Sequence, residues 1–131
     1  MTDARSEISL ALINDYPVIV EGLGRMLQDH PRLRVVERNS EGLPDGGADL
    51  VLYDAFAATE RGTAEVTRLI AEPRFRKVVM YTWNVSADRV SEAMGMGIDG
   101  FLSKELSAAD LAEALVRVHE GQRVVSPEPV R

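Results

Sequence analysis

The sequence predicts an α/β domain with a doubly wound parallel β-sheet that carries helices on both faces. Five short apolar runs alternate along the chain with stretches of helical periodicity. Such alternation is typical of parallel strands that are joined by right-handed helical crossovers. Polar residues that could form a site directly follow the first, third, fourth and fifth runs, as at the strand ends of such sheets. The length of 131 residues suits a single domain of this kind.

The five predicted strands are short and rich in β-branched residues. Runs of this length are too short for amphipathic helices, which usually need about ten residues or more. The central runs are apolar enough to be buried on both faces of the sheet. The predicted strands span Ile8–Ile13, Leu33–Val36, Leu50–Tyr53, Val78–Tyr81 and Gly100–Leu102.

Four helices are predicted from apolar residues at helical spacing. The first begins near Pro17, which a first turn tolerates, and another ends before Pro73. A further helix opens at Ser86. The last runs from Ser107, which begins a capping-box pattern, to Gly121, which suits a C-terminal cap. Their expected core residues are Val20, Leu23, Leu27, Val66, Leu69, Ile70, Val90, Ala93, Met94, Leu111, Ala114, Leu115 and Val118.

The segment between the second and third predicted strands, residues 39–48, contains three glycines and a proline. It leaves room for at most one helical turn, so the second helix of the alternation is expected to be shortened or absent. Residues 1–7 are expected to form a disordered N-terminus, residues 8–125 the folded domain, and residues 126–131 the start of a linker.

Composition narrows the classes of function. The net charge of −6 argues against binding a nucleic-acid backbone, which requires a basic patch. No apolar run is long enough to span a bilayer. The absence of cysteine excludes disulfide and thiolate chemistry and fits a cytoplasmic protein. His30 and His119 lack a second ligand at metal spacing and are interpreted as surface residues.

Polar side chains gather where the predicted strands end. In an open doubly wound sheet, the functional groups lie at the carboxyl ends of the strands. We therefore expect two carboxylates, a hydroxyl and an ammonium to converge on one pocket. The residues that follow the strands are Asn14, Asp15, Asp54, Thr82, Ser103 and Lys104.

This set of groups suits phosphoryl chemistry. Two neighbouring carboxylates, those of Asp15 and Asp54, repel each other unless a cation lies between them, and Mg²⁺ prefers such oxygen ligands. A carboxylate beside the metal can attack phosphorus and form an acyl phosphate. The Thr82 hydroxyl can donate a hydrogen bond to a phosphoryl oxygen, and the Lys104 ammonium can neutralise another.

Four motifs together resemble those of CheY-like response-regulator receiver domains, above all the receivers of NarL/LuxR-class transcriptional regulators. The resemblance runs from about Ile8 to Val125. It implies a flavodoxin-like (βα)5 fold with the strand order 2-1-3-4-5. The motifs are Asn14-Asp15-Tyr16-Pro17 with Glu21-Gly22-Leu23, Ala48-Asp49-Leu50-Val51-Leu52-Tyr53-Asp54, Val78-Val79-Met80-Tyr81-Thr82, and Gly97-Ile98-Asp99-Gly100-Phe101-Leu102-Ser103-Lys104.

The resemblance also implies a role for each site residue. Asp54 would accept the phosphoryl group, Thr82 would be the switch hydroxyl and Lys104 the cation that senses phosphate. Phe101 would be the aromatic residue that changes rotamer on activation, although a fixed core position is an equal interpretation. Mg²⁺ would be held by Asp15, Asp54, the backbone carbonyl of Phe56 and, through water, Asn14.

The main hypothesis is a receiver that is phosphorylated by a sensor histidine kinase and controls a transcriptional regulator. It would form a homodimer, act away from membranes, and contact DNA only through a C-terminal helix-turn-helix output domain beyond this sequence. The alternative is a degenerate receiver that acts by protein contact without phosphorylation. Departures from the family pattern motivate it: Asn14 replaces an acid, the segment at Phe56 lacks a proline, and Trp83 replaces a smaller residue.

An aspartate-dependent phosphatase is a third reading, and the sequence disfavours it. That chemistry commonly uses a second acid two residues after the nucleophile as a general acid. Phe56 holds that position here. We therefore do not expect an enzyme. Trp83 is interpreted either as a contact for a partner or as a plug over the pocket.

Overall fold

The computed structural model describes residues 7–13, 17–39, 46–54, 60–83 and 86–126, and these form one sheet of six parallel strands. The order β2-β1-β3-β4-β5-β6 confirms the expected order 2-1-3-4-5 and extends it by one strand. Each predicted strand is present, and four of them are longer than predicted. The strands are β1 (Ile8–Ile13), β2 (Leu33–Asn39), β3 (Ala48–Asp54), β4 (Phe75–Thr82), β5 (Gly100–Ser103) and β6 (Val124–Ser126).

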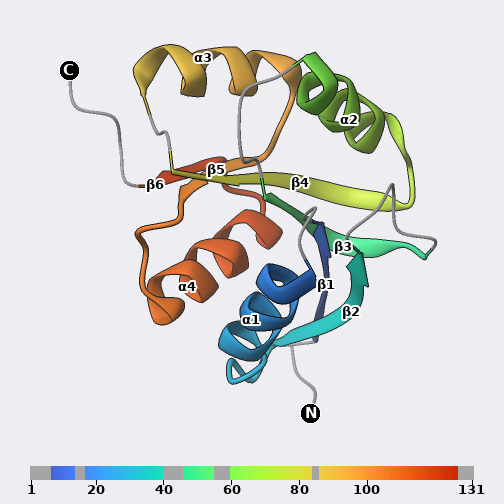
Figure 1. Ribbon diagram of the computed structural model, residues 1–131, viewed down its shortest axis with the longest axis vertical. Coiled ribbons are helices and arrows are strands. Elements are labelled where there is room, and N and C mark those ends of the chain that lie inside the picture. Colours follow the sequence, from blue (N-terminus) through green and yellow to red (C-terminus); the bar gives the residue numbers. More distant parts are fainter. Residues whose placement is uncertain (1–6, 14–16, 40–45, 55–59, 84–85, 127–131) are drawn as a thin grey trace.

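Four helices cover the sheet, and they lie on both of its faces, as predicted. Figure 1 shows α1 and α4 on one face and α2 and α3 on the other. Within the described residues there is no helix between β2 and β3, and residues 40–45 of that connection lie outside them. The helices are α1 (Pro17–Leu27), α2 (Glu60–Ala71), α3 (Ala87–Met96) and α4 (Ala108–His119).

Two hydrophobic cores lie on opposite faces of the sheet, because successive residues of a strand point to opposite sides. The first core joins one face of the strands to α1 and α4, with Leu12, Leu52 and Leu115 among its buried members. The second joins the other face to α2 and α3 and includes Val51 and Phe101. The apolar residues predicted to face the core are buried or packed against it wherever their side chains are described.

The predicted helix ends have the expected capping contacts. The hydroxyl of Ser86 accepts a hydrogen bond from the backbone N–H of Arg89, and that of Ser107 accepts one from Asp110. Each hydroxyl satisfies an N–H group that has no partner within its own helix. After α4, Gly121 adopts a positive φ of 104°, as expected of a residue that follows a helix C-terminus.

Strand β6 was not predicted. It pairs in parallel with β5, and Val124 lies opposite Gly100 in that pairing. Its three residues were not among the five predicted strands, and their pairing with β5 identifies them as a strand. Ser126, which we predicted to begin the linker, is the last residue of β6, and residues 127–131 lie outside the described ones.

The motif between α3 and β5 has a local structural reason at three of its positions. Gly97 ends α3 with a φ of 105°, a conformation that glycine adopts without steric cost. A Cβ atom on Gly100 would lie 3.0 Å from a methyl carbon of Val118, so glycine lets α4 approach β5. The carboxylate of Asp99 accepts a hydrogen bond from the backbone N–H of Val78 at 2.9 Å.

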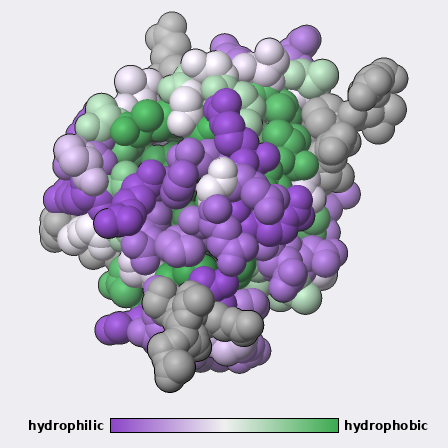
Figure 2. Space-filling view, turned by 180° about the vertical axis from the view of Figure 1, so that it is seen from behind, coloured by the Kyte–Doolittle hydropathy of each residue, from purple (hydrophilic) through white to green (hydrophobic). Residues whose placement is uncertain are grey.

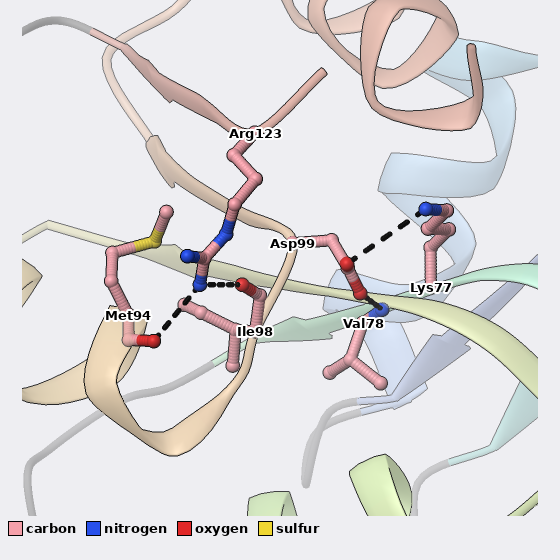
Figure 3. Close-up of polar contacts among 6 residues, drawn as sticks. All are labelled: Lys77, Val78, Met94, Ile98, Asp99 and Arg123. Carbon is pink, nitrogen blue, oxygen red and sulfur yellow. Dashed lines mark hydrogen bonds and ion pairs between the residues drawn. The ribbon is translucent and has the colours of Figure 1, made fainter. Parts of the chain in front are cut away.

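Arg123 connects the start of β6 to the end of α3 (Figure 3). One nitrogen of its guanidinium donates hydrogen bonds to the backbone carbonyls of Met94, at 2.9 Å, and Ile98, at 2.8 Å. Carbonyls at a helix C-terminus lack partners within the helix and carry partial negative charge, which a cation stabilises. Asp99, which directly precedes β5, has a carboxylate oxygen 4.0 Å from the ammonium of Lys77 on β4 (Figure 3).

The described surface exposes few large apolar side chains. They are Val18, Met26, Val36 and Trp83. Figure 2 shows a broad band of hydrophilic side chains across the middle of the face seen from behind, with hydrophobic residues to its sides. None of the helices in the described ranges is long and apolar enough to cross a membrane.

The contacts of Arg123 predict its contribution to stability. We expect Arg123→Ala to lower the free energy of unfolding by about 1 kcal/mol, because the carbonyl of Met94 in the last turn of α3 and that of Ile98 just after it lose a charged donor. Arg76→Ala is the matched control, since the side chain of Arg76 is exposed on β4 and makes no hydrogen bond or ion pair with the described residues. Denaturant unfolding measures both changes, and equal losses would show that the Arg123 contacts do not stabilise the fold.

Candidate functional site

Three neighbouring strands end at one edge of the sheet, and each ends in a buried polar residue. They are Asp54 on β3, Thr82 on β4 and Ser103 on β5. The registers explain why they lie near each other: Asp54 is opposite Tyr81, and Thr82 is opposite Ser103. Because the strands are parallel, their carboxyl ends meet at the same edge, as the sequence predicted.

An ion pair between Asp54 and Lys104 occupies this edge. The ammonium of Lys104 contacts the Oδ1 atom of Asp54, and only 1% of the Asp54 side chain and 10% of the Lys104 side chain are exposed. Charges removed from water in this way need a partner of opposite sign, because each alone would lose its hydration without compensation. The structure thus brings together the two residues predicted to accept and to sense the phosphoryl group.

The backbone after β5 holds Lys104 in place. The N–H of Lys104 donates to the carbonyl of Thr82 at 2.9 Å, which continues the pairing of β4 and β5 by one residue. The hydroxyl of Ser103 accepts a hydrogen bond from the N–H of Glu105 at 3.0 Å. The N–H of Leu106 donates to the carbonyl of Ser103 at 3.2 Å. These bonds form a tight turn that leads from the site into α4.

The alternation of side chains divides the site between the two faces of the sheet. Tyr81 belongs to the core beneath α1 and α4, so its neighbour Thr82 points to the opposite face. Phe101 lies in the core beneath α2 and α3 and is 2% exposed. In this structure Phe101 is therefore a packed core residue on the same face as Thr82.

Two aromatic residues beside the site take distinct positions. Tyr53, which precedes Asp54, is buried, and its hydroxyl donates a hydrogen bond of 2.6 Å to the carboxylate of Glu65 on α2. This contact fixes α2 to β3 immediately before the candidate acceptor. Trp83, which follows Thr82, is 60% exposed and is thus available to a partner.

Tyr81 is a site residue that the sequence analysis assigned only to a strand. Its buried ring lies with its centroid 5.9 Å from the ammonium of Lys104. Burial, and secondly the charge of Asp54, raise the pKa of the Tyr81 phenol above its usual value of 10.0. The alternation along β4 could have identified Tyr81 as the residue on the opposite face from Thr82, but its approach to Lys104 depends on the fold of the turn after β5.

The predicted metal ligands are described only in part. Asp54 is described, whereas Asn14, Asp15 and Phe56 lie outside the described residues. Among the described residues, no group of three acidic or histidine side chains is close enough to hold a metal ion. The last residue of β1, Ile13, is the register partner of Tyr53. Strand β1 therefore ends beside the strand that carries Asp54, and a buried carboxylate there is a fitting oxygen donor for Mg²⁺.

The raised pKa of Tyr81 predicts how stability depends on pH. The unfolded chain releases this proton near pH 10 while the folded chain retains it, so the free energy of unfolding should fall as pH rises above about 10. We expect Tyr81→Phe, which has no such proton, to lose less stability than the parent protein between about pH 9 and pH 11. Thermal unfolding over this range measures the slopes, and identical slopes would contradict the assignment.

Comparison with known proteins gives sequence relatives. No family model matches the chain. The chain is 31% identical over 129 residues to the transcriptional regulatory protein LnrK of Bacillus subtilis, a match that covers 92% of the chain and 58% of LnrK. It is 26% identical over 127 residues to the response regulator protein VraR of Staphylococcus epidermidis, covering 92% of the chain and 61% of VraR. The chain thus spans about three fifths of the length of these curated relatives.

Solved structures give the same answer at the level of the fold. The signal receiver domain of the response regulator NarL from Mycobacterium tuberculosis matches with a TM-score of 0.72 at 20% identity, covering 89% of this chain and 99% of that domain. The resemblance drawn from the four motifs is confirmed: the homologues of this chain are response regulators, and the chain has the fold of their receiver domains.

Proposed function

We propose that this receiver domain accepts a phosphoryl group on Asp54 from the phosphohistidine of a sensor histidine kinase. The observation that carries the proposal is the buried ion pair between Asp54 and Lys104 at the carboxyl ends of β3 and β5. A carboxylate that is nearly removed from water loses its hydration, and pairing with a cation offsets that loss only in part. Charged groups of this kind are concentrated at functional sites.

The proposed step is a transfer between two nucleophiles. A carboxylate oxygen of Asp54 attacks the phosphorus, a P–O bond forms, and the P–N bond to the histidine breaks. The imidazole leaves with the electron pair of that bond and takes up a proton. In the acyl phosphate that results, negative charge lies on the phosphoryl oxygens. The ammonium of Lys104, which is already in contact with Asp54, can follow that charge and neutralise it.

Thr82 is proposed to register the phosphorylated state. It ends β4, the strand next to Asp54, and the carbonyl of Thr82 is bonded to the N–H of Lys104. A hydrogen bond from its hydroxyl to a phosphoryl oxygen would draw Thr82 toward β3. Phe101 lies on the same face of the sheet, so a change of its rotamer on activation belongs to the same proposal.

Mg²⁺ is the proposed cofactor. Asp15 and Asp54 would hold the ion through their carboxylates, Phe56 through its backbone carbonyl and Asn14 through a water molecule. When bound, the ion neutralises charge on the carboxylates and the phosphoryl oxygens. Of this chain's own residues, Asp54 would supply the nucleophilic oxygen, and Lys104, which contacts Asp54, would balance its charge.

The output is proposed to lie outside this domain. The relatives extend well beyond the matched region, and LnrK is a transcriptional regulatory protein. We propose a cytoplasmic regulator that forms a homodimer and binds DNA through a C-terminal helix-turn-helix domain, which residues 127–131 would join to the receiver. The net charge of −6 supports the proposal that the receiver itself does not bind DNA.

A degenerate receiver is the second candidate, and the exposure of Trp83 favours it. A large aromatic residue that is 60% exposed next to Thr82 suits direct contact with another protein, and such contact does not require phosphorylation of Asp54. Phosphorylation of the parent protein decides between the two candidates.

Asp54→Asn tests the acceptor. Incubation with acetyl phosphate and Mg²⁺ should add one phosphoryl mass to the parent protein and none to this variant, because an amide oxygen is a poor nucleophile toward phosphorus. Asp88→Asn is the matched control, since Asp88 is exposed on α3. Intact-mass spectrometry measures the increment. Labelling that persists in Asp54→Asn would refute the assignment, and an unlabelled parent would favour the degenerate receiver.

Asn14→Asp tests the metal site. The substitution adds one negative charge to the proposed ligand set, so it should tighten Mg²⁺ binding and destabilise the metal-free domain through repulsion of Asp15 and Asp54. Gln122→Glu is the matched control, because Gln122 precedes the amino end of β6, at the opposite edge of the parallel sheet. Calorimetry measures the affinity, with Trp83 fluorescence as a second signal. Equal affinities for parent and Asn14→Asp would show that position 14 does not sense the ion.

A further inference from the structure

The Tyr81 ring is placed where it can act on the cation of the site. Tyr81 is the register partner of Asp54 on one side and of Leu102 on the other, so it lies between β3 and β5. Lys104 follows β5, and its ammonium lies 5.9 Å from the centroid of the Tyr81 ring. The same ammonium contacts Asp54. The aromatic ring and the carboxylate therefore share one buried cation.

A ring in this position attracts the cation. The π-face of an aromatic ring carries partial negative charge, and a cation within about 6 Å of its centroid is stabilised, more strongly when water is excluded. Both side chains meet that condition, since Tyr81 is 5% exposed and the Lys104 side chain 10%. A leucine or valine at position 81 would keep the position apolar but would not attract an ammonium.

We infer that the face of the Tyr81 ring positions the Lys104 ammonium in the pocket, so that the lysine stays beside Asp54 while the charge on that residue changes. This inference rests on the proposed function and adds a positioning residue to it. During transfer, negative charge moves from the carboxylate of Asp54 to the phosphoryl oxygens. The flexible four-carbon stem of lysine then has freedom to turn away. The ring does not change charge, and so it keeps the ammonium within reach of both.

Two substitutions at position 81 separate the ring from the hydroxyl. Tyr81→Phe keeps the π-face and should be labelled by acetyl phosphate and Mg²⁺ at nearly the parent rate. Tyr81→Leu removes the face and should lower the initial rate about twofold to thirtyfold, the range that one cation–π contact supports. Should Tyr81→Leu fail to fold, Tyr81→Met takes its place, because methionine also fills the core without a π-face.

A second measurement does not depend on phosphorylation. The protons on Cε of Lys104 should show an upfield ring-current shift in NMR spectra of the parent and Tyr81→Phe, and this shift should be absent in Tyr81→Leu. If Tyr81 only filled the core, Tyr81→Leu would slow labelling whether or not Lys104 is present. In a Lys104→Met background, Tyr81→Leu should cause no further loss of rate.

The outcomes distinguish the inference from the proposed function. If the parent is labelled on Asp54 but Tyr81→Leu reacts at the parent rate, the proposed function stands and the role of Tyr81 is overturned. If the Lys104 protons have no ring-current shift in the parent, the role of Tyr81 is likewise overturned. If the parent is not labelled at all, the proposed function fails, and the inference fails with it.

Discussion

The rest of the site depends on one interaction, the buried ion pair between Asp54 and Lys104. A carboxylate at the carboxyl end of β3, with 1% of its side chain exposed, requires a cation because the core beneath it supplies no water. The turn after β5, which is separated from β3 by β4, provides that cation. The bond from the Lys104 N–H to the Thr82 carbonyl fixes this turn against the end of β4.

The parallel sheet makes this arrangement possible. Successive side chains of a strand point alternately into the two cores. The alternation continues to the strand ends, where polar residues replace apolar ones. Tyr81 therefore faces the core of α1 and α4, whereas Phe101 faces the core of α2 and α3. Neighbouring residues of the site therefore pack against different layers of helices.

The end of α3 and the start of β6 are joined by a second group of polar contacts, at the edge of the sheet opposite the Asp54–Lys104 ion pair. Gly97 adopts a positive φ there, and Asp99 accepts a hydrogen bond from the N–H of Val78. Gly100 leaves room for the close approach of Val118. Arg123 adds two hydrogen bonds to the carbonyls at this turn. Part of the motif that resembles the receiver family is thus explained by the packing of the fold and not by phosphoryl chemistry.

The sequence by itself determined the class of fold, the order of the five predicted strands and four helices, and the caps at Ser86 and Ser107, because periodicity and capping are local properties of the chain. It also determined the edge at which Asp54, Thr82 and Lys104 meet, because parallel strands end at the same edge of a sheet. Only the tertiary structure decided the pairing of β6 with β5, the bond of Tyr53 to Glu65, and the approach of the Tyr81 ring to Lys104. These contacts join residues from different elements. Their geometry depends on strand register and on how helices pack over the sheet, neither of which leaves a pattern in any single stretch of sequence.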